Sequence, residues 1–253
     1  MIVLLCLLAL QILNTGSTEV LPRVVNGHLA KEGEIPYVVG IKSQGILKAT
    51  WCGGNIISNE WILTAAHCFD HFFLWSKGHI YYGSTVLGQG LTGSFRYKNI
   101  FKHPGYGKFR NDLALIKQPR IRFSDTIKSI PLPSSHDISQ SYANQSASTA
   151  GWNLKELPEP QQLRWTIVKI ASDENCKRKY PNNGEVLCGR VNPGSAMCKG
   201  DSGGPLVHHE KKTLVGITSF GEDRCDNGEL VGFTNVVNYL DWIRRVSGVK
   251  SIN

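Results

Sequence analysis

The sequence of 253 residues lacks an apolar run long enough to cross a membrane. Its longest candidate, residues 2–13, is apolar except for Gln11, whereas a spanning helix needs about 20 such residues. The small polar residues "NTGST" follow this run, an order typical of a secretory signal peptide. We therefore predict a signal peptide over residues 1–17, secretion, and no membrane partner. Because the usual positive charge at the start is missing, a short membrane-associated anchor is the alternative.

The chain also lacks any CxxC pair, and its cysteine spacings match no common zinc pattern. Cys6 lies in the leader, so six cysteines would remain after secretion, and six in a secreted chain indicate three disulfides. These are Cys52, Cys68, Cys176, Cys188, Cys198 and Cys225. Their pairing stays open at this point, and we expect no metal and no cofactor.

No long run of a single charge is present. The 28 Lys and Arg exceed the 20 Asp and Glu, giving a net charge of +8 that is spread along the chain. Nucleic-acid binding is usually marked by basic stripes with interleaved aromatics. We predict no nucleic-acid partner and interpret the charges as a solvated surface with weak attraction to acidic surfaces.

Repeats and low-complexity tracts are absent as well, and what is present is typical of strands. The 26 glycines and the short apolar stretches between turn formers indicate a mainly β protein. Strand-like runs occur at residues 37–41, 113–116, 164–170 and 213–220.

Two segments depart from this pattern. Tyr239, Trp242, Ile243 and Val246 recur at helical spacing and predict a short amphipathic helix near the C-terminus. Residues 131–145 are poor in apolar side chains and rich in turn formers, so we interpret them as a linker between two near-equal halves.

Three polar residues have contexts that suggest nucleophilic catalysis. Ser202 stands between glycines in "CKGDSGGPLV", but a serine hydroxyl needs a neighbouring base, and the base needs a third group to hold its tautomer. His67 follows small residues and precedes a cysteine in "WILTAAHC". Asp112 opens the apolar run "NDLALI", where burial demands a hydrogen-bond partner. The alternative for Ser202 is a hydroxyl in a tight glycine-rich turn.

Four motifs carry a specific resemblance. "VVNG" at 24–27, "TAAHC" at 64–68, "NDLALI" at 111–116 and "GDSGGPL" at 200–206 resemble the signatures of chymotrypsin-like serine proteases of the trypsin superfamily, invertebrate digestive type. The resemblance implies a monomeric protease domain over residues 24–253, built of two six-stranded antiparallel β-barrels (about 24–135 and about 136–253) with a C-terminal α-helix. It implies protein or peptide substrates, protease inhibitors as partners, and a digestive setting such as the gut lumen.

The same resemblance assigns the catalytic roles. Ser202 would attack the scissile carbonyl, His67 would take the proton and return it to the leaving amine, and Asp112 would orient His67 and stabilise its cation. The backbone N–H groups of Gly200 and Ser202 would form the oxyanion hole. A glycine suits position 200 because the family holds this residue in a conformation that a Cβ disfavours.

Activation and disulfides also follow from the resemblance. A trypsin-like activating protease would remove a propeptide at residues 18–23 by cleaving after Arg23, and the new ammonium of Val24 would insert beside Asp201. The implied disulfides are Cys52–Cys68, Cys176–Cys188 and Cys198–Cys225. A further pair common in vertebrate relatives is missing, because Ala147 and His208 stand at its positions.

The resemblance places a primary specificity pocket around six residues, and Ala196 takes the place of the aspartate that makes trypsin prefer Arg and Lys. Gly221 would leave the entrance open and Val231 would make the pocket shallower. The implied pocket residues are Ala196, Met197, Ser219, Phe220, Gly221 and Val231. We expect chymotrypsin-like or elastase-like cleavage after medium to large uncharged residues. If Asp226 or Glu229 reaches the pocket, basic residues would be accepted instead.

Three smaller expectations complete the interpretation. The segment "GSTVLGQGLTGS" has no carboxylate, so we expect no calcium site there. Asn144 begins the glycosylation sequon "NQS". The alternative function is that of a catalytically inactive homologue that acts as a binding module. Such proteins generally lose the serine, the histidine or the aspartate, whereas this chain retains Ser202, His67 and Asp112.

Overall fold

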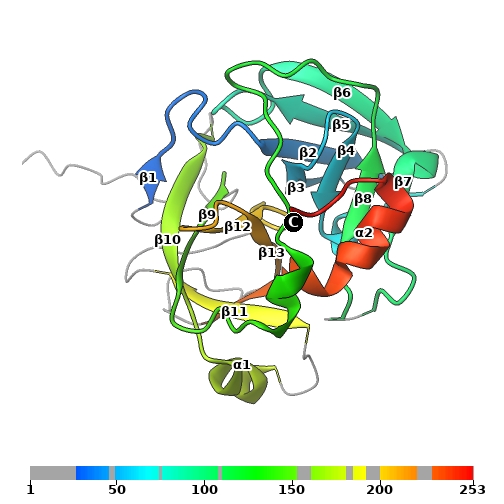
Figure 1. Cartoon of the computed structure of the whole chain (residues 1–253). Helices are drawn as coiled ribbons and strands as arrows, with labels where there is room; N and C mark the ends of the chain where they lie inside the picture. The colour runs from blue at the N-terminus through cyan, green and yellow to red at the C-terminus, as the bar shows by residue number, and fades with distance from the viewer. Residues whose placement is uncertain are drawn as a thin grey trace, which may run out of the picture.

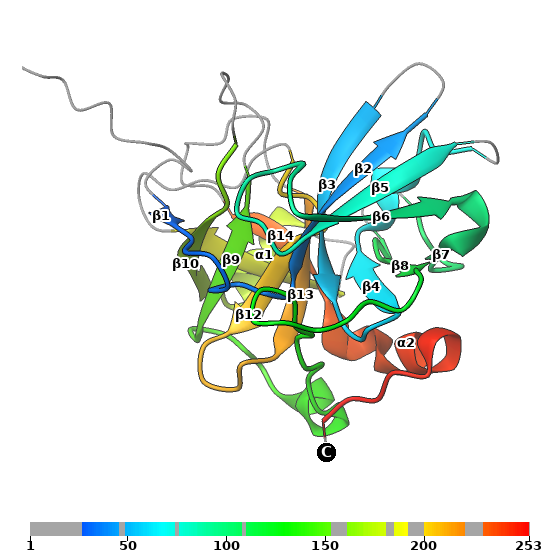
Figure 2. The same ribbon diagram turned by 90° about the horizontal axis from the view of Figure 1, so that it is seen from above.

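Two antiparallel sheets lie side by side and hold nearly all the regular structure (Figures 1 and 2). The structure is a computed structural model. It describes residues 27–45, 49–73, 76–107, 110–152, 161–180, 185–191, 200–220 and 230–252. Within these ranges, no helix is both long and apolar enough to cross a membrane.

The sheet from the C-terminal half closes into a barrel. Its strands run in the order β10-β11-β14-β13-β12-β9, and β9 pairs back with β10. They are β9 (Ser146–Gly151), β10 (Arg164–Ile170), β11 (Val186–Val191), β12 (Pro205–His208), β13 (Leu214–Phe220) and β14 (Val231–Asn235). A seventh strand, β1 (His28–Leu29), adds to the outside of β10. The alternation of buried and partly exposed residues along β10 directs Val168 and Ile170 into the barrel core.

The sheet from the N-terminal half curls around the larger apolar core. Its order is β6-β5-β2-β3-β4-β8-β7. The strands are β2 (Val38–Gln44), β3 (Ala49–Ile56), β4 (Trp61–Thr64), β5 (Lys77–Tyr82), β6 (Leu91–Arg96), β7 (Ile100–Lys102) and β8 (Ala114–Lys117). The mainly β fold is confirmed. Where a second six-stranded barrel was expected, there is a curled seven-stranded sheet, and no ladder joins β6 to β7 in the described ranges.

The predicted C-terminal helix is confirmed as α2 (Leu240–Ser247). It follows η4 (Val236–Tyr239) and buries Trp242 and Ile243 in the core of the N-terminal sheet, beside β7 and β8 (Figure 1). Gly248 ends the helix at φ +75°, a left-handed conformation that glycine adopts without strain. The last segment of the chain therefore crosses from the C-terminal barrel back to the other half.

Between β8 and β9, residues 131–145 cross from one sheet to the other and include η3 (Ser135–Ser139). This connection is packed and not freely solvated, because Asp137 and Tyr142 are buried. The other short helices are η1 (Ala66–Phe69), η2 (Tyr97–Asn99) and α1 (Asp173–Lys179), the last capped by the Ser172 side chain.

Candidate active site

The pairing of β4 with β8 brings His67 and Asp112 to the same edge of the N-terminal sheet. Thr64 lies opposite Ala114 in this antiparallel ladder. His67 lies three residues beyond Thr64, in η1, and Asp112 lies two residues before Ala114. Both side chains therefore reach one end of the strand pair although 45 positions separate them in the sequence.

Asp112 holds His67 through two hydrogen bonds. The His67 backbone N–H donates to Oδ1 of Asp112 at 2.9 Å, and its ring Nδ1 lies 2.7 Å from Oδ2. Ser219 adds a third bond, because its hydroxyl donates to Oδ2 at 2.5 Å. A carboxylate accepts and does not donate, so Nδ1 carries the proton and Nε2 is left as the basic nitrogen.

The contact between Asp112 and His67 shifts the pKa values of both side chains. Burial alone would raise the pKa of Asp112, but the hydrogen bond and charge of His67, with the Ser219 hydrogen bond, outweigh it and hold that pKa below the ordinary 3.8. Burial would lower the pKa of His67, but the hydrogen bond and charge of Asp112 outweigh it, and the net pKa lies above 6.5. At neutral pH Asp112 is therefore ionised, and His67 is a better base than an ordinary histidine.

A second group of charges lies beside His67. The Tyr106 hydroxyl donates to both carboxylate oxygens of Asp70, at 3.0 and 2.9 Å, and Nζ of Lys102 lies 2.9 Å from the same carboxylate. Asp70 raises the pKa of His67 and Lys102 lowers it. Sequence reasoning missed this group, and the available signal was Asp70 three residues after His67 in "HCFD".

Both groups open into one cavity of about 350 Å³. Its lining residues are His67, Asp70, Tyr106, Gly107, Asp112, Ser219 and Phe220. His67 therefore lies at a cavity that is bordered by Phe220, the last residue of β13.

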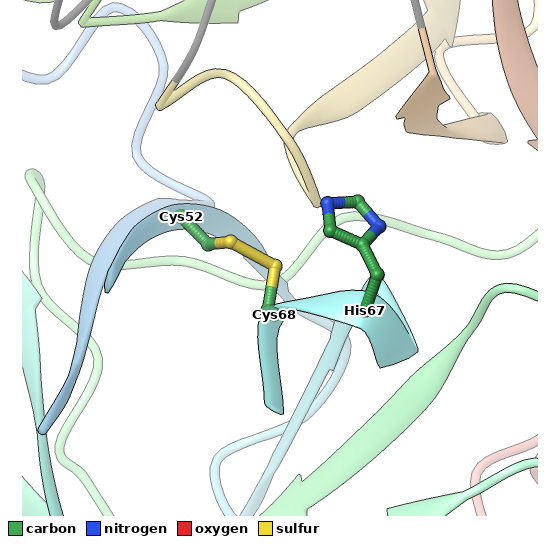
Figure 3. A group of neighbouring side chains, drawn as sticks. All are labelled: Cys52, His67 and Cys68. Carbon is green, nitrogen blue, oxygen red and sulfur yellow. A yellow bond between two sulfur atoms is a disulfide. The ribbon is translucent and has the colours of Figure 1, made fainter. Parts of the chain in front are cut away.

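A disulfide stands beside His67 and ties η1 to β3. Cys52 is bonded to Cys68, and Figure 3 shows the imidazole next to this bond. Ligand atoms of Cys52, His67 and Cys68 lie within 4.8 Å of one another, a spacing that could hold a metal ion. The two sulfurs are bonded to each other, so neither is a thiolate, and the group is a poor metal ligand set. A second disulfide, Cys176–Cys188, joins α1 to β11.

The loop that carries Ser202 is clamped between the two sheets. The carbonyl of Ser202 accepts from the Gly53 N–H of β3 at 2.7 Å, and the Gly203 N–H donates to Thr218 of β13 at 2.7 Å. The buried Asn55 side chain donates to the carbonyl of Gly203 at 2.9 Å. These contacts place the loop on the strand that also carries Cys52. Among the described residues, the Ser202 hydroxyl makes no hydrogen bond with His67.

Gly200 and Asp201 precede the serine in distinct environments. Gly200 has φ +98°, where a side chain would be strained. Asp201 is only 1% exposed. Its carboxylate lies against Gly151 of β9, where an added Cβ would come within 2.0 Å of Oδ1.

The predicted pocket residues that the structure describes lie at the ends of β13 and β14. The Phe220 ring packs edge-on against Tyr180, with centroids 4.6 Å apart, and covers Gly232. Val231 is buried and packs in the C-terminal core with Phe233. The other predicted site residues fall outside the described residues: Arg23, Val24, Ala196, Met197, Cys198, Gly221 and Cys225.

Comparison with known proteins agrees with the fold and the motifs. A trypsin family profile matches residues 24–243. The chain belongs to the trypsin family of serine proteases. Among trypsin-family relatives, serine protease 1 of Drosophila melanogaster is 37% identical over 242 residues, covering 93% of this chain and 90% of that protein. The collagenase of Hypoderma lineatum is 34% identical over 236 residues, covering 90% and 88%.

A solved structure of HL collagenase matches with a TM-score of 0.81 and 33% identity, covering 89% of this chain and 99% of that one. This trypsin-family chain is therefore a serine endopeptidase, which is a hydrolase. Its partners, in general terms, are the substrates of a protease.

Proposed function

We propose that Ser202, His67 and Asp112 are the catalytic triad of a secreted endopeptidase that works through an acyl-enzyme. The observation that carries the proposal is the doubly hydrogen-bonded His67–Asp112 pair, which leaves Nε2 of His67 as the free base. The loop of Ser202 supports it, because Gly53 fixes this loop on the same sheet.

In the proposed reaction, Ser202 Oγ attacks the carbonyl carbon of the scissile peptide while His67 Nε2 takes its proton. Asp112 stays ionised and stabilises the imidazolium. The oxyanion accepts hydrogen bonds from the N–H groups of Gly200 and Ser202. His67 then protonates the leaving amine, and water repeats the sequence on the acyl ester to release the second product and restore Ser202.

Activation by cleavage after Arg23 belongs to the same proposal. β1 begins at His28 and pairs with β10, where Arg164 lies opposite Gly151, the glycine that touches Asp201. The chain just after the proposed cleavage site is thus anchored one strand away from Asp201. A buried carboxylate is a favourable partner for the Val24 ammonium, and the pair would organise the backbone at Gly200.

For specificity, we propose cleavage after medium to large uncharged residues. Ala196 in place of an acid supports this preference, as does Val231, which is apolar and buried at the start of β14. The competing specificity, for Arg and Lys, requires Asp226 or Glu229 to enter the pocket.

The test is to express the full chain, cleave it with trypsin, and assay peptides that end in Phe, Leu, Ala or Arg before the scissile bond. We expect activity only after cleavage, with Phe or Leu preferred. Highest activity on the Arg peptide would overturn the specificity. Because the Hypoderma lineatum relative is named a collagenase, collagen belongs in the substrate panel.

Ser202→Ala is the decisive variant for catalysis. We expect it to lower kcat by about 10⁴-fold or more and to abolish covalent labelling by an organophosphonate. Unchanged labelling would show that Ser202 is not the labelled nucleophile, and equal, negligible turnover in the wild type and the variant would favour the inactive binding homologue.

A further inference from the structure

The N-terminal sheet concentrates positive charge that forms no run in the sequence. Residues 35–111 contain eight Lys and Arg but only two acids, Glu60 and Asp70. Asp70 pairs with Lys102 beside the active site. The strands β2, β3, β5 and β6 carry no carboxylate at all. The fold brings three of these cations, Lys42, Lys77 and Arg96, onto adjacent strands of this sheet.

The strand register shows which side chains share the outer face of this sheet. Lys77 lies opposite both Arg96 of β6 and Gln44 of β2. In the next row, Lys42 lies between His79 of β5 and Trp51 of β3. Paired residues and residues two apart point to the same side of a sheet. We define the basic face as Lys42, Trp51, Lys77, His79, Tyr81 and Arg96.

Within the part of the chain that the structure describes, the cations of the basic face have no acidic partner. Ion pairs within the described ranges do not include Lys42, Lys77 or Arg96. Lys77 and Arg96 are both exposed. Like charges directly opposite each other in a ladder are unfavourable, so an anion placed between this pair would relieve a cost that the free protein bears.

Aromatic rings accompany these cations. Nζ of Lys42 lies 5.3 Å from the Trp51 ring centroid, and the Trp51 and Tyr81 rings are 5.5 Å apart. Both rings are half-buried and lie near Gly40, and the side chain of the half-buried Leu87 lies over that glycine. The face thus carries two aromatic rings, one of them beside the Lys42 ammonium, on the same side of the sheet as Lys77 and Arg96.

We propose that the basic face binds an anionic glycan chain that bears sulfate or carboxylate groups. The apolar C–H faces of sugar rings can pack on Trp51 and Tyr81, while Arg96, Lys77 and Lys42 pair with the acidic substituents. A glycan is favoured over single-stranded nucleic acid because the chain is proposed to be secreted, and this choice rests on that part of the proposed function. No residue of the basic face is among those that line the cavity beside His67, so a bound glycan would hold the protease without filling that cavity.

The test measures binding of a heparin oligosaccharide, as a polysulfated probe, to the full chain carrying Ser202→Ala, so that the result does not depend on catalysis. We expect Lys77→Ser/Arg96→Ser to weaken binding about tenfold or more near 0.1 M salt and to flatten the salt dependence by roughly two charges. The matched control, Lys177→Ser/Arg178→Ser on α1, removes the same charge from another surface and should change binding little.

A second variant separates stacking from charge. Tyr81→Ser should weaken heparin binding without changing its salt dependence, and thermal unfolding checks that each variant is folded. Equal losses in the α1 control would overturn the proposal, since they would show only net-charge attraction. Tighter binding of single-stranded DNA or polyglutamate of matched charge than of heparin would also overturn it.

Discussion

Asp70 and Lys102, which form an ion pair with each other, act in opposite directions on the pKa of His67. Asp70 favours the imidazolium and Lys102 disfavours it, while Tyr106 fixes the Asp70 carboxylate through both oxygens. Asp112 dominates the net shift, so the Asp70–Lys102 pair adjusts a basicity already set by Asp112. We infer that these two residues act on the reaction through His67 and not by touching the reacting atoms.

Neutralising Asp70 should make His67 a weaker base. In Asp70→Asn the pKa of His67 falls, so the acid limb of the kcat/KM profile moves to lower pH, because the active neutral imidazole persists further into acid. Lys102→Met should move the same limb to higher pH. The profiles of the activated enzyme, measured with one peptide substrate, check both directions.

Tyr106→Phe supplies the control, because it removes a hydrogen bond to Asp70 without changing its charge. Its pH profile should stay closer to that of the wild type than the Asp70→Asn profile does. Shifts of the same sign in Asp70→Asn and Lys102→Met would contradict the electrostatic account and indicate a change of structure.

At the scale of elements, the position of Ser202 depends on how closely its loop approaches β3 and β4. Gly203 has φ +81°, and an added Cβ would come within 2.2 Å of Thr64 Oγ1 and 2.4 Å of the Gly53 carbonyl. Thr64 itself donates to that carbonyl at 2.7 Å. Glycine is therefore needed at position 203 for two reasons: the backbone has a positive φ, and no space for a Cβ is left between the loop and the N-terminal sheet.

Gly203→Ala should lower kcat by about 100-fold, because a shift of Ser202 by about 1 Å is enough for such a loss. The matched control is Gly248→Ala, which has φ +75° but nothing within 4 Å of the added Cβ. The control should lose about 1 kcal/mol of stability from backbone strain and keep its activity. Steady-state kinetics and denaturant unfolding of both variants make the comparison, and equal kcat values would refute the steric argument.

For the whole molecule, the sequence predicted what local patterns determine. The runs at 164–170 and 213–220 became β10 and β13, and helical spacing at Trp242 and Ile243 predicted α2. Contacts set by register were not predictable, because they join residues far apart in the chain. The bond from Gly53 to Ser202, the position of Asn55 under Gly203, and the alignment of Lys77 with Arg96 all depend on how strands pair across and between the sheets.

One such register contact buries a titratable ring in the C-terminal barrel. His208 of β12 is buried opposite Ala147 of β9, with Nε2 2.5 Å from Gln145 Oε1 and Nδ1 accepting the Lys211 N–H at 3.2 Å. This arrangement suits the neutral ring. Burial and then the Lys211 charge lower the pKa of His208, with a smaller contribution from His209, and the opposing charges of Glu210 and Asp137 do not restore it.

His208 should therefore contribute a loss of stability as pH falls below 6.5, because the unfolded chain takes up a proton that folded His208 refuses until lower pH. His208→Gln should remove this contribution, so that the unfolding free energy falls less than in the wild type as pH drops below 6.5. The exposed His71 provides the control, since His71→Gln leaves the buried ring in place. An unchanged slope in His208→Gln, measured by denaturant unfolding at several pH values, would exclude His208 as the cause.

The ladder that buries His208 also offers a position for a covalent link across the barrel. Directly paired residues in an antiparallel ladder have Cα atoms about 4.5–5.5 Å apart, inside the range that disulfides span. Ala147→Cys/His208→Cys would close a loop of about 60 residues, and chain entropy then gives about 4 kcal/mol of added stability.

The gain should appear as a higher Tm and a higher denaturant midpoint, and the acid sensitivity should fall at the same time because the buried imidazole is gone. Ala147→Ser/His208→Ser removes the imidazole without forming the bond, so the difference between the two double variants isolates the contribution of the disulfide. If both variants show the same Tm, the β9–β12 pair does not limit unfolding of the barrel.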